Sequence, residues 1–265
     1  MIPYDFISEW RTQVPWPQDV QVEQDLILSR ALVDIFKSPI VKSSLAFRGG
    51  TALYKLHISP PRRYSEDIDF VQIHSEPAGG LLDAIRTVLD PWLGVPKRKR
   101  KEGSVSLIYR TSSEEPQPVP MRLKVEINTR EHFTVLGIED RDFAVKSRWF
   151  SGMAAIKTYS LNELLGTKLR ALYQRKKGRD LFDLWIAHQY PEFDAGKVVE
   201  CFRRYLEHEG LQISRAEFEA NLDKKLSDSG FTDDTKPLLA PGVLWSVEEA
   251  GRFVLEELIS RLSSD

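Results

Sequence analysis

Two aspartates separated by one residue, Asp67 and Asp69, carry the clearest chemistry in the sequence. Residues 66–73 have the composition of a short strand, in which alternate side chains share a face, so the two carboxylates would lie side by side. Neighbouring carboxylates repel each other unless a cation lies between them. Mg²⁺ takes oxygen ligands of this kind and completes its shell with substrate phosphates. The pair predicts a metal site, although an isolated Asp-X-Asp also occurs on ordinary surfaces.

A pair of glycines, Gly49 and Gly50, precedes the aspartates and is followed by Thr51. The glycines join an apolar segment, residues 45–47, to a helix-like stretch that begins ALYKL. Glycines before a helix let phosphates approach the backbone N–H groups at the positive end of the helix. A plain turn is the alternative. In this order, however, a phosphate site and metal-binding carboxylates indicate nucleotide chemistry.

A third carboxylate, Glu126, lies in a second predicted strand, residues 122–128. Apolar residues alternate there with Lys124, Glu126 and Asn128, so one face of the strand packs on a core. If this strand lies beside residues 66–73, Glu126 comes close to both aspartates, as a two-metal site requires. The alternative is a half-exposed sheet with a solvated face of lysine and glutamate.

Lys168 is an anomaly in the second half of the chain. Residues 160–175 have the period of a helix, and Lys168 falls within its apolar stripe, which consists of Leu161, Leu164, Leu165, Leu169 and Leu172. Glu163, Thr167 and Arg170 are expected on the opposite side. A lysine directed at a core is costly unless it is paired or extends to solvent. The ammonium group would then bind carboxylates or a triphosphate.

Two further acids, Asp180 and Asp183, are three residues apart in the next predicted helix, residues 178–190. Gly178 is expected to end the preceding helix, and Asp180 falls in the first turn of the next one. Asp180 has a sufficient explanation as a helix-start residue. The alternative is that one or both acids orient Lys168 or bind a nucleotide hydroxyl.

These motifs together resemble the AbiEii nucleotidyltransferase toxins, which include mycobacterial toxins of the same class and belong to the DNA polymerase β-like nucleotidyltransferase superfamily. The resemblance extends over residues 20–190 and rests on GGTAL, RYSEDIDF, KVEI and KLRALYQRKKGRDLFDLW. One departure is Gly-Gly-Thr where the superfamily often has Gly-Ser, so Thr51 is the candidate for the missing hydroxyl. The last 70 or so residues match no motif.

The resemblance assigns roles only at matching positions. The implied metal ligands are Asp67, Asp69 and Glu126, with Glu126 either a ligand or a base. The implied catalytic residues are Asp67, Asp69, Glu126 and Lys168. The implied nucleotide-binding residues are Gly49, Gly50, Thr51, Ser65, Lys124, Lys168, Asp180 and Asp183. Ser65 also matches a serine that is phosphorylated in some members.

The implied activity is transfer of a nucleotide from a nucleoside triphosphate, with Mg²⁺ or Mn²⁺, to the 3′ end of tRNA. Such a toxin inhibits translation and growth in toxin–antitoxin or abortive-infection systems, and its antitoxin is encoded by a neighbouring gene. Two other functions stay open. Under these alternatives the chain would be either a GTP-type nucleotide-binding regulator with little catalysis, or an RNA-binding or partner-binding protein whose acids are structural.

The composition sets further limits. The net charge of −2 provides no global basic field, but two basic runs are candidate RNA contacts, Lys97-Arg98-Lys99-Arg100-Lys101 and Arg175-Lys176-Lys177. The first run would form a hairpin tip, either gripping phosphates or merely solvated. The only cysteine, Cys201, excludes an intrachain disulfide and favours the cytoplasm. We expect no signal peptide, no membrane span and a monomer.

The predicted elements divide at about residue 158. An α/β (α+β) lobe with a mixed sheet is expected over residues 1–158, including helices at 18–37 and 79–90 and a further strand in 143–158. A helical lobe that contributes nucleotide-binding residues is expected over residues 159–265, with helices at 160–176, 179–189, 194–209, 214–226 and 246–263 and a loop at 227–245.

Overall fold

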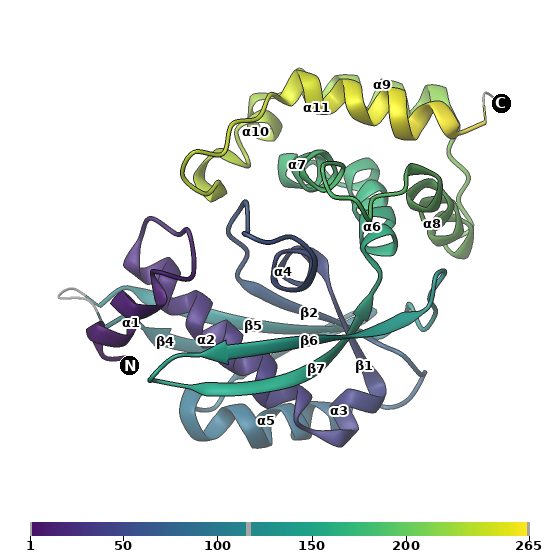
Figure 1. Ribbon diagram of the computed structural model, residues 1–265. Helices are drawn as coiled ribbons and strands as arrows, with labels where there is room; N and C mark the ends of the chain where they lie inside the picture. The colour runs from purple at the N-terminus through teal and green to yellow at the C-terminus, as the bar shows by residue number, and fades with distance from the viewer. Residues whose placement is uncertain (1, 115–117, 264–265) are drawn as a thin grey trace. The chain divides into compact units, whose positions relative to one another are not determined.

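The computed structural model describes residues 2–114 and 118–263. Within these residues, seven strands form one mixed sheet in the order β3-β4-β5-β2-β1-β7-β6 (Figure 1). The strands are β1 Leu45–Arg48, β2 Asp67–Gln72, β3 Lys97–Lys101, β4 Ser104–Ser112, β5 Pro120–Asn128, β6 Ile138–Lys146 and β7 Ser151–Tyr159. Helices accompany the sheet and follow it in the chain, which confirms the predicted α/β (α+β) class.

The centre of the sheet joins strands that are distant in sequence. Strand β2 pairs antiparallel with β1 and parallel with β5, and β1 pairs parallel with β7. The alternation predicted for β5 is confirmed, because its apolar residues Leu123, Val125 and Ile127 are buried and the intervening Lys124 and Glu126 are half-buried. The sheet therefore has one apolar face and one polar face in this region.

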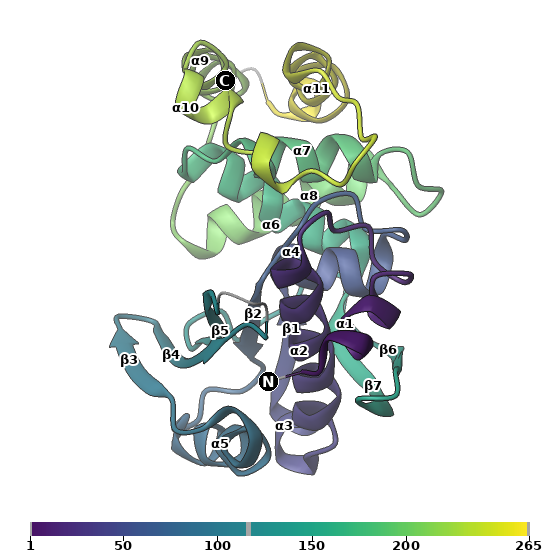
Figure 2. The ribbon, with the colours of Figure 1, turned by 90° about the vertical axis from the view of Figure 1, so that its left-hand side faces the viewer.

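The apolar face is covered by α2 Asp19–Phe36, α3 Pro39–Ser44 and α5 Gly79–Leu93 (Figures 1 and 2). Phe36 of α2 packs against Phe70 of β2, and Phe70 packs against Phe47 of β1, with ring centroids 5.7 Å apart in each pair. Helix α1 Tyr4–Trp10 packs on α2. These contacts fix β1 and β2 from one side.

The polar face of β2 is next to the first residues of α4 Gly49–Ala52, which continues as a π-helical turn, Leu53–His57. The predicted helix after the glycine pair is therefore present, with Gly49 and Gly50 as its first two residues. Because β1 ends at Arg48 and α4 begins at once, the glycines are held beside the start of β2.

The contacts divide the chain into two compact units: Met1–Phe133 with Ile138–Tyr159, and Thr134–Gly137 with Ser160–Asp265. The second unit contains α6 Leu161–Gln174, α7 Gly178–Ala187, α8 Ala195–His208, α9 Arg215–Leu226, α10 Ser229–Thr232 and α11 Val247–Phe253. Its core includes the fully buried rings of Phe182, Phe202 and Phe218. Whether residues 1–158 and 159–265 fold as separate domains stays a prediction.

Glu163 joins the two sequence segments of the helical unit. Its carboxylate accepts hydrogen bonds at 2.8 Å from the Thr134 hydroxyl and from the backbone N–H groups of Val135 and Leu136. The Tyr205 hydroxyl donates a fourth bond, also at 2.8 Å. Glu163 is fully buried, so the helix side opposite the leucine stripe is also covered at this position.

Several predicted boundaries were wrong. The basic run 97–101 is strand β3 rather than a hairpin tip, because it pairs antiparallel along its length with β4. The segment 143–158 holds parts of two strands, β6 and β7, which form a hairpin. Gly178 is the first residue of α7 rather than the end of the preceding helix. Among the described residues no helix is both long and apolar enough to span a membrane.

Candidate active site

The register of the central strands brings the predicted acids together. Asp69 of β2 lies opposite Arg48 of β1 on one side and opposite Glu126 of β5 on the other. Asp67 lies opposite Lys124. Directly paired residues of neighbouring strands share one face of a sheet. The predicted placement of Glu126 beside the aspartates is therefore confirmed.

The electrostatics of Asp67 and Asp69 fit a site that binds a cation. Burial is the largest influence and raises the pKa of Asp67, while the attraction of Lys124 offsets only part of the rise. Burial and then repulsion from Asp67 raise the pKa of Asp69. The buried Oδ1 atom of Asp67 has no hydrogen-bond partner among the described residues. An oxygen-binding divalent cation would satisfy this atom and remove the repulsion.

Lys124 already neutralises part of this negative charge. Its Nζ atom is 2.7 Å from Glu126 Oε2 and 3.8 Å from Asp67 Oδ2. Burial lowers the pKa of Lys124, but the hydrogen bond to Glu126 and the nearby aspartates outweigh it and raise the pKa overall. Burial likewise raises the pKa of Glu126, but Lys124 and the Ser106 hydroxyl, which donates to Oε2 at 3.1 Å, lower it overall.

The donor set fits a cation held by two aspartates better than one held by three acids. No group of three or more histidine, cysteine, aspartate or glutamate side chains is placed to bind one metal ion in the described part of the chain. The Lys124 ammonium group lies 2.7 Å from Glu126 Oε2, an oxygen that a metal ion would otherwise need. A metal-ligand or base role for Glu126 stays a prediction.

Both residues of the glycine pair lie where a side chain would clash with neighbouring groups. Gly49 has φ +83°, in the left-handed region, and a Cβ there would lie 2.8 Å from Asp69 Oδ2. A Cβ on Gly50 would lie 2.5 Å from the Arg63 guanidinium and 3.1 Å from Ser65 Oγ. The backbone of Gly49 therefore lies close to Asp69, and that of Gly50 lies close to Arg63 and Ser65, which glycine permits because it has no Cβ.

The hydroxyls of Thr51 and Ser65 form one chain of hydrogen bonds. Thr51 Oγ1 donates to the backbone oxygen of Asp67 at 2.6 Å and lies 2.8 Å from Ser65 Oγ. A hydroxyl has one proton, so the Ser65 hydroxyl is the donor to Thr51. Thr51 is 2% exposed. Its hydroxyl thus fixes the start of β2, and its contact with a nucleotide stays a prediction.

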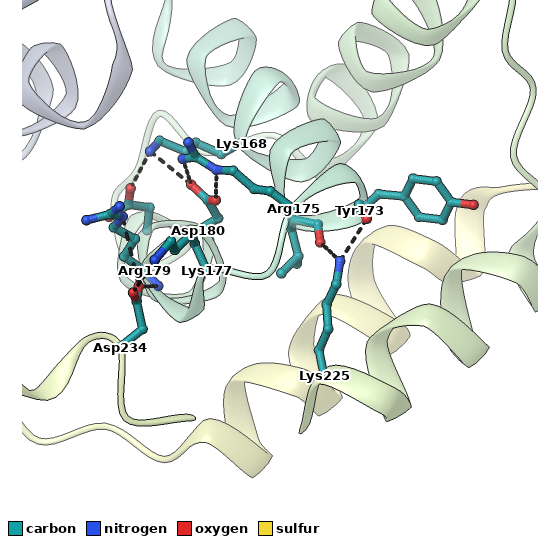
Figure 3. A network of polar contacts seen from close by, with 10 residues as sticks. Lys168, Tyr173, Arg175, Lys177, Arg179, Asp180, Lys225 and Asp234 are labelled. Atoms are coloured by element: carbon teal, nitrogen blue, oxygen red, sulfur yellow. Dashed lines mark hydrogen bonds and ion pairs between the residues drawn. The ribbon is translucent and has the colours of Figure 1, made fainter. Parts of the chain in front are cut away.

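In the helical unit, Lys168 is paired with both predicted acids. Its Nζ atom is 3.2 Å from Asp180 Oδ1 and 2.9 Å from Asp183 Oδ2 (Figure 3). Lys168 is buried and both aspartates are fully buried. Arg175 donates two further bonds to Asp180, at 2.7 and 2.8 Å. Burial raises the pKa of Asp180, but these two cations lower it overall. The alternative that Lys168 extends to solvent is therefore wrong.

The second basic cluster is neutralised within the same unit. Arg175 binds Asp180, and Lys176 Nζ lies 2.5 Å from Asp228 Oδ2. Lys177 Nζ lies 3.2 Å from Asp234 Oδ1 (Figure 3). Lys225 donates to the carbonyl oxygens of Leu172 and Tyr173 near the end of α6. The role of Arg175, Lys176 and Lys177 as RNA contacts stays a prediction, with acids already beside each of them.

Comparison with known proteins decides the family. A model of the family described as nucleotidyl transferase AbiEii toxin, type IV toxin–antitoxin system, matches residues 30–252. The chain belongs to this AbiEii family. It is therefore a nucleotidyltransferase and a toxin of a toxin–antitoxin system, and membership implies a cognate antitoxin and a nucleoside triphosphate substrate. AbiEii enzymes generally use a divalent metal ion.

Solved structures show the same fold as this AbiEii chain. MenT4, a nucleotidyltransferase toxin of Mycobacterium tuberculosis, has 16% identity and a TM-score of 0.69, and the match covers 100% of this chain and 92% of MenT4. A putative nucleotidyltransferase from Helicobacter pylori has 19% identity and a TM-score of 0.57, covering 91% of this chain and 95% of that one. No curated protein sequence matches the chain.

Two residues beside the AbiEii acids were missed in the sequence. Arg48 lies opposite Asp69, forms an ion pair with Glu131 and contributes a positive charge next to Asp69. Ser106 supports Glu126 from β4. Arg48 had a signal, because it directly precedes the glycine pair at the end of a strand. Ser106 had none, because only the pairing of β4 with β5 brings it to the site.

Proposed function

We propose that this AbiEii nucleotidyltransferase transfers a nucleotidyl group from a nucleoside triphosphate to the 3′ hydroxyl of tRNA in a Mg²⁺-dependent reaction, and thereby stops translation. The observation that carries the proposal is the half-satisfied acid pair on β2. Asp67 and Asp69 have raised pKa values, and a buried oxygen of Asp67 has no partner among the described residues. A site that stabilises two adjacent negative charges so poorly is suited to a bound divalent cation.

Each residue of the proposed site has a separate task. Asp67 and Asp69 would hold the metal ion, which when bound offsets phosphate charge and makes the attacking hydroxyl more acidic. Gly49 and Gly50 would admit the triphosphate close to the backbone. The 3′ oxygen of the acceptor attacks the α-phosphorus and pyrophosphate leaves. Lys124 carries a positive charge beside the acids, where it would neutralise phosphate oxygens during this transfer.

The proposal for Glu126 keeps two roles. Bound to Lys124, it orients that ammonium group within the acid row. Released from Lys124 when substrate phosphates take the ammonium, it would act as a metal ligand or as the base that accepts the hydroxyl proton. Support for the second role is its position opposite Asp69 in the register of β2 and β5.

Nucleotide binding by Lys168, Asp180 and Asp183 is part of the same proposal. Support comes from the free-energy cost of burying two carboxylates, which are compensated by Lys168 and Arg175. Buried ion pairs contribute little net stability compared with apolar residues of the same size, so a functional reason for keeping them is reasonable. We also propose that the protein is a cytoplasmic monomer and that Mn²⁺ can replace Mg²⁺.

The test is incubation with each labelled nucleoside triphosphate, Mg²⁺ and total tRNA, with products resolved on a sequencing gel. Asp69→Asn removes one metal ligand, and Asp142→Asn makes the same chemical change at an exposed position on β6. We expect label on tRNA with the wild type and with Asp142→Asn, and none with Asp69→Asn. Absence of label from every nucleotide, or equal label with both variants, would contradict the proposal.

Growth inhibition provides an independent readout. Expression in a bacterium should slow growth, and Asp67→Asn should relieve the inhibition while circular dichroism shows that the variant is folded. Equal inhibition by the folded variant would mean that toxicity does not depend on the acid pair.

A further inference from the structure

Strand β3 divides its cationic residues between the two faces of the sheet. Successive side chains of a strand alternate, so Lys97, Lys99 and Lys101 lie on one face and Arg98 and Arg100 on the other. The sequence presents them as one uninterrupted basic run. The strand converts this run into two separate surfaces.

The register of four strands identifies the face that carries the lysines. Lys99 lies opposite Ser106 of β4, which lies opposite Glu126 of β5, which lies opposite Asp69 of β2. In the neighbouring row, Lys97 lies opposite Ile108, then Lys124, then Asp67. Directly opposed residues share a face, so the lysines extend the row of acids out to the edge of the sheet.

The arginines belong to the other face. Arg98 lies opposite Leu107 and Arg100 opposite Val105, both of which are buried on the apolar side of the sheet. Both arginines line a cavity of about 800 Å³ together with Gly79, the first residue of α5. Figure 2 shows α5 beneath β3 and β4. Lys97 and Lys99 do not line this cavity, whereas Lys101, at the end of β3, does.

The charges of Lys97 and Lys99 have no acidic partner in the described residues, whereas Lys101 helps to lower the pKa of Glu126. All five residues of β3 are exposed, and none forms an ion pair with an acid in the described residues. The cluster around Arg175 differs, since its members pair with Asp180, Asp228 and Asp234. Unpaired lysines on an exposed strand favour a polyanion, because binding releases the counterions condensed on its phosphates.

The spacing indicates which part of an acceptor they would meet. Three strand-to-strand steps separate β3 from β2, and each step is about 4.8 Å, so the backbones of Lys99 and Asp69 are about 14 Å apart. A single strand whose 3′ end reaches the aspartates would therefore place phosphates a few nucleotides upstream near β3. Lysine side chains are long enough to follow such a strand.

We propose that Lys97 and Lys99, and not Arg98 and Arg100, bind the phosphodiester backbone of the acceptor RNA just upstream of its reacting 3′ end. The inference rests on the proposed transfer to RNA and adds a face, a direction and a set of residues to it. The lysine face acts as a guide that selects a single-stranded polyanionic end.

The experiment compares two double variants of the full chain, Lys97→Gln/Lys99→Gln and Arg98→Gln/Arg100→Gln. Each removes two positive charges from exposed positions of one strand, so net charge changes equally. The measurements are kcat and KM for bulk tRNA, KM for the nucleoside triphosphate, and the salt dependence of KM for tRNA.

The lysine variant should raise KM for tRNA about 25-fold at 0.1 M salt and reduce the slope of log KM against log salt by about 1.4, from two single-strand phosphate contacts. KM for the nucleoside triphosphate should not change. The arginine variant should resemble the wild type. Equal effects of the two variants, or a larger effect of the arginine variant, would overturn the inference. If the wild type labels no RNA, the proposed function is wrong, and the inference that rests on it is wrong as well.

Discussion

Replacing Gly49 by alanine tests whether the glycine pair serves the acids or only a turn. Two features disfavour a side chain at position 49, namely a φ of +83° and a Cβ position only 2.8 Å from Asp69 Oδ2. Gly94, at the end of α5 in the same unit, has φ +76° and nothing within 4 Å of its Cβ position. Gly94→Ala therefore also introduces a side chain at positive φ, but without a steric contact.

The expected magnitudes follow from these two terms. A residue other than glycine in the left-handed region costs about 1–2 kcal/mol, which is the whole expected effect of Gly94→Ala. Gly49→Ala adds a clash with the Asp69 carboxylate, and overpacking of this kind costs about 1–3 kcal/mol. The difference between the two variants should be about 2 kcal/mol, or about 6 °C in melting temperature.

Urea unfolding in metal-free buffer measures the free energy of unfolding of both variants. Thermal melting with Mg²⁺ and each nucleoside triphosphate then measures ligand stabilisation, which acts only on a competent site. Gly94→Ala should keep both the ligand shift and tRNA labelling, whereas Gly49→Ala should lose them because Asp69 is displaced. Equal destabilisation by the two variants, with labelling retained in both, would refute the argument that Gly49 is kept open for the acid pair.

Three other substitutions test buried charges. The pKa of Asp69 is raised in the folded state, so its ionised form destabilises the fold. In metal-free buffer at neutral pH, Asp69→Asn should therefore be more stable than the wild type, by a difference that shrinks as the pH falls. A constant difference in urea unfolding at all pH values would contradict this. Glu163→Gln should cost about 2 kcal/mol in urea unfolding, because bonds to a buried carboxylate are lost, while the exposed Glu207→Gln should stay near zero. Burial lowers the pKa of Lys225 to about 8 from 10.5, so between these pH values only the unfolded chain binds the proton. The free energy of unfolding of the wild type should therefore rise with pH relative to that of Lys225→Met. Equal pH dependence of the two unfolding free energies would contradict this.

The sequence was sufficient to predict that Asp67, Asp69 and Glu126 lie together, because strand alternation is a local property. Asp67 and Asp69 had to share a face once residues 66–73 formed a strand, and β5 needed only to be the neighbour of β2 to bring Glu126 beside them. The fold class followed from the same patterns. Helix boundaries such as those of α2 and α8 were predicted within about two residues, because their apolar periods end at clear polar or turn residues.

Other features depend on contacts between distant segments and had no local signal. The run 97–101 is highly polar, which favours a hairpin tip, but backbone pairing with β4 makes it an edge strand. Exposed lysines on an edge strand also prevent further strand addition. The helical period places Glu163 opposite the leucine stripe but gives no sign that residues 134–136 donate hydrogen bonds to it. The ion pair between Lys124 and Glu126 could not be inferred from their spacing alone, because it depends on side-chain conformation.

The four residues 134–137 have a consequence for how this protein is divided. The helical unit is not a continuous piece of sequence, since the chain enters it at Thr134, leaves after Gly137 and returns at Ser160. A fragment that begins at Ser160 would retain every helix of the unit yet lack three of the donors to Glu163, and so would contain a buried carboxylate with Tyr205 as its remaining donor. Exchange of the helical half between relatives by a single junction would pair Glu163 with residues 134–137 of the other parent, so exchange that also carries residues 134–137 should give the more stable chimera.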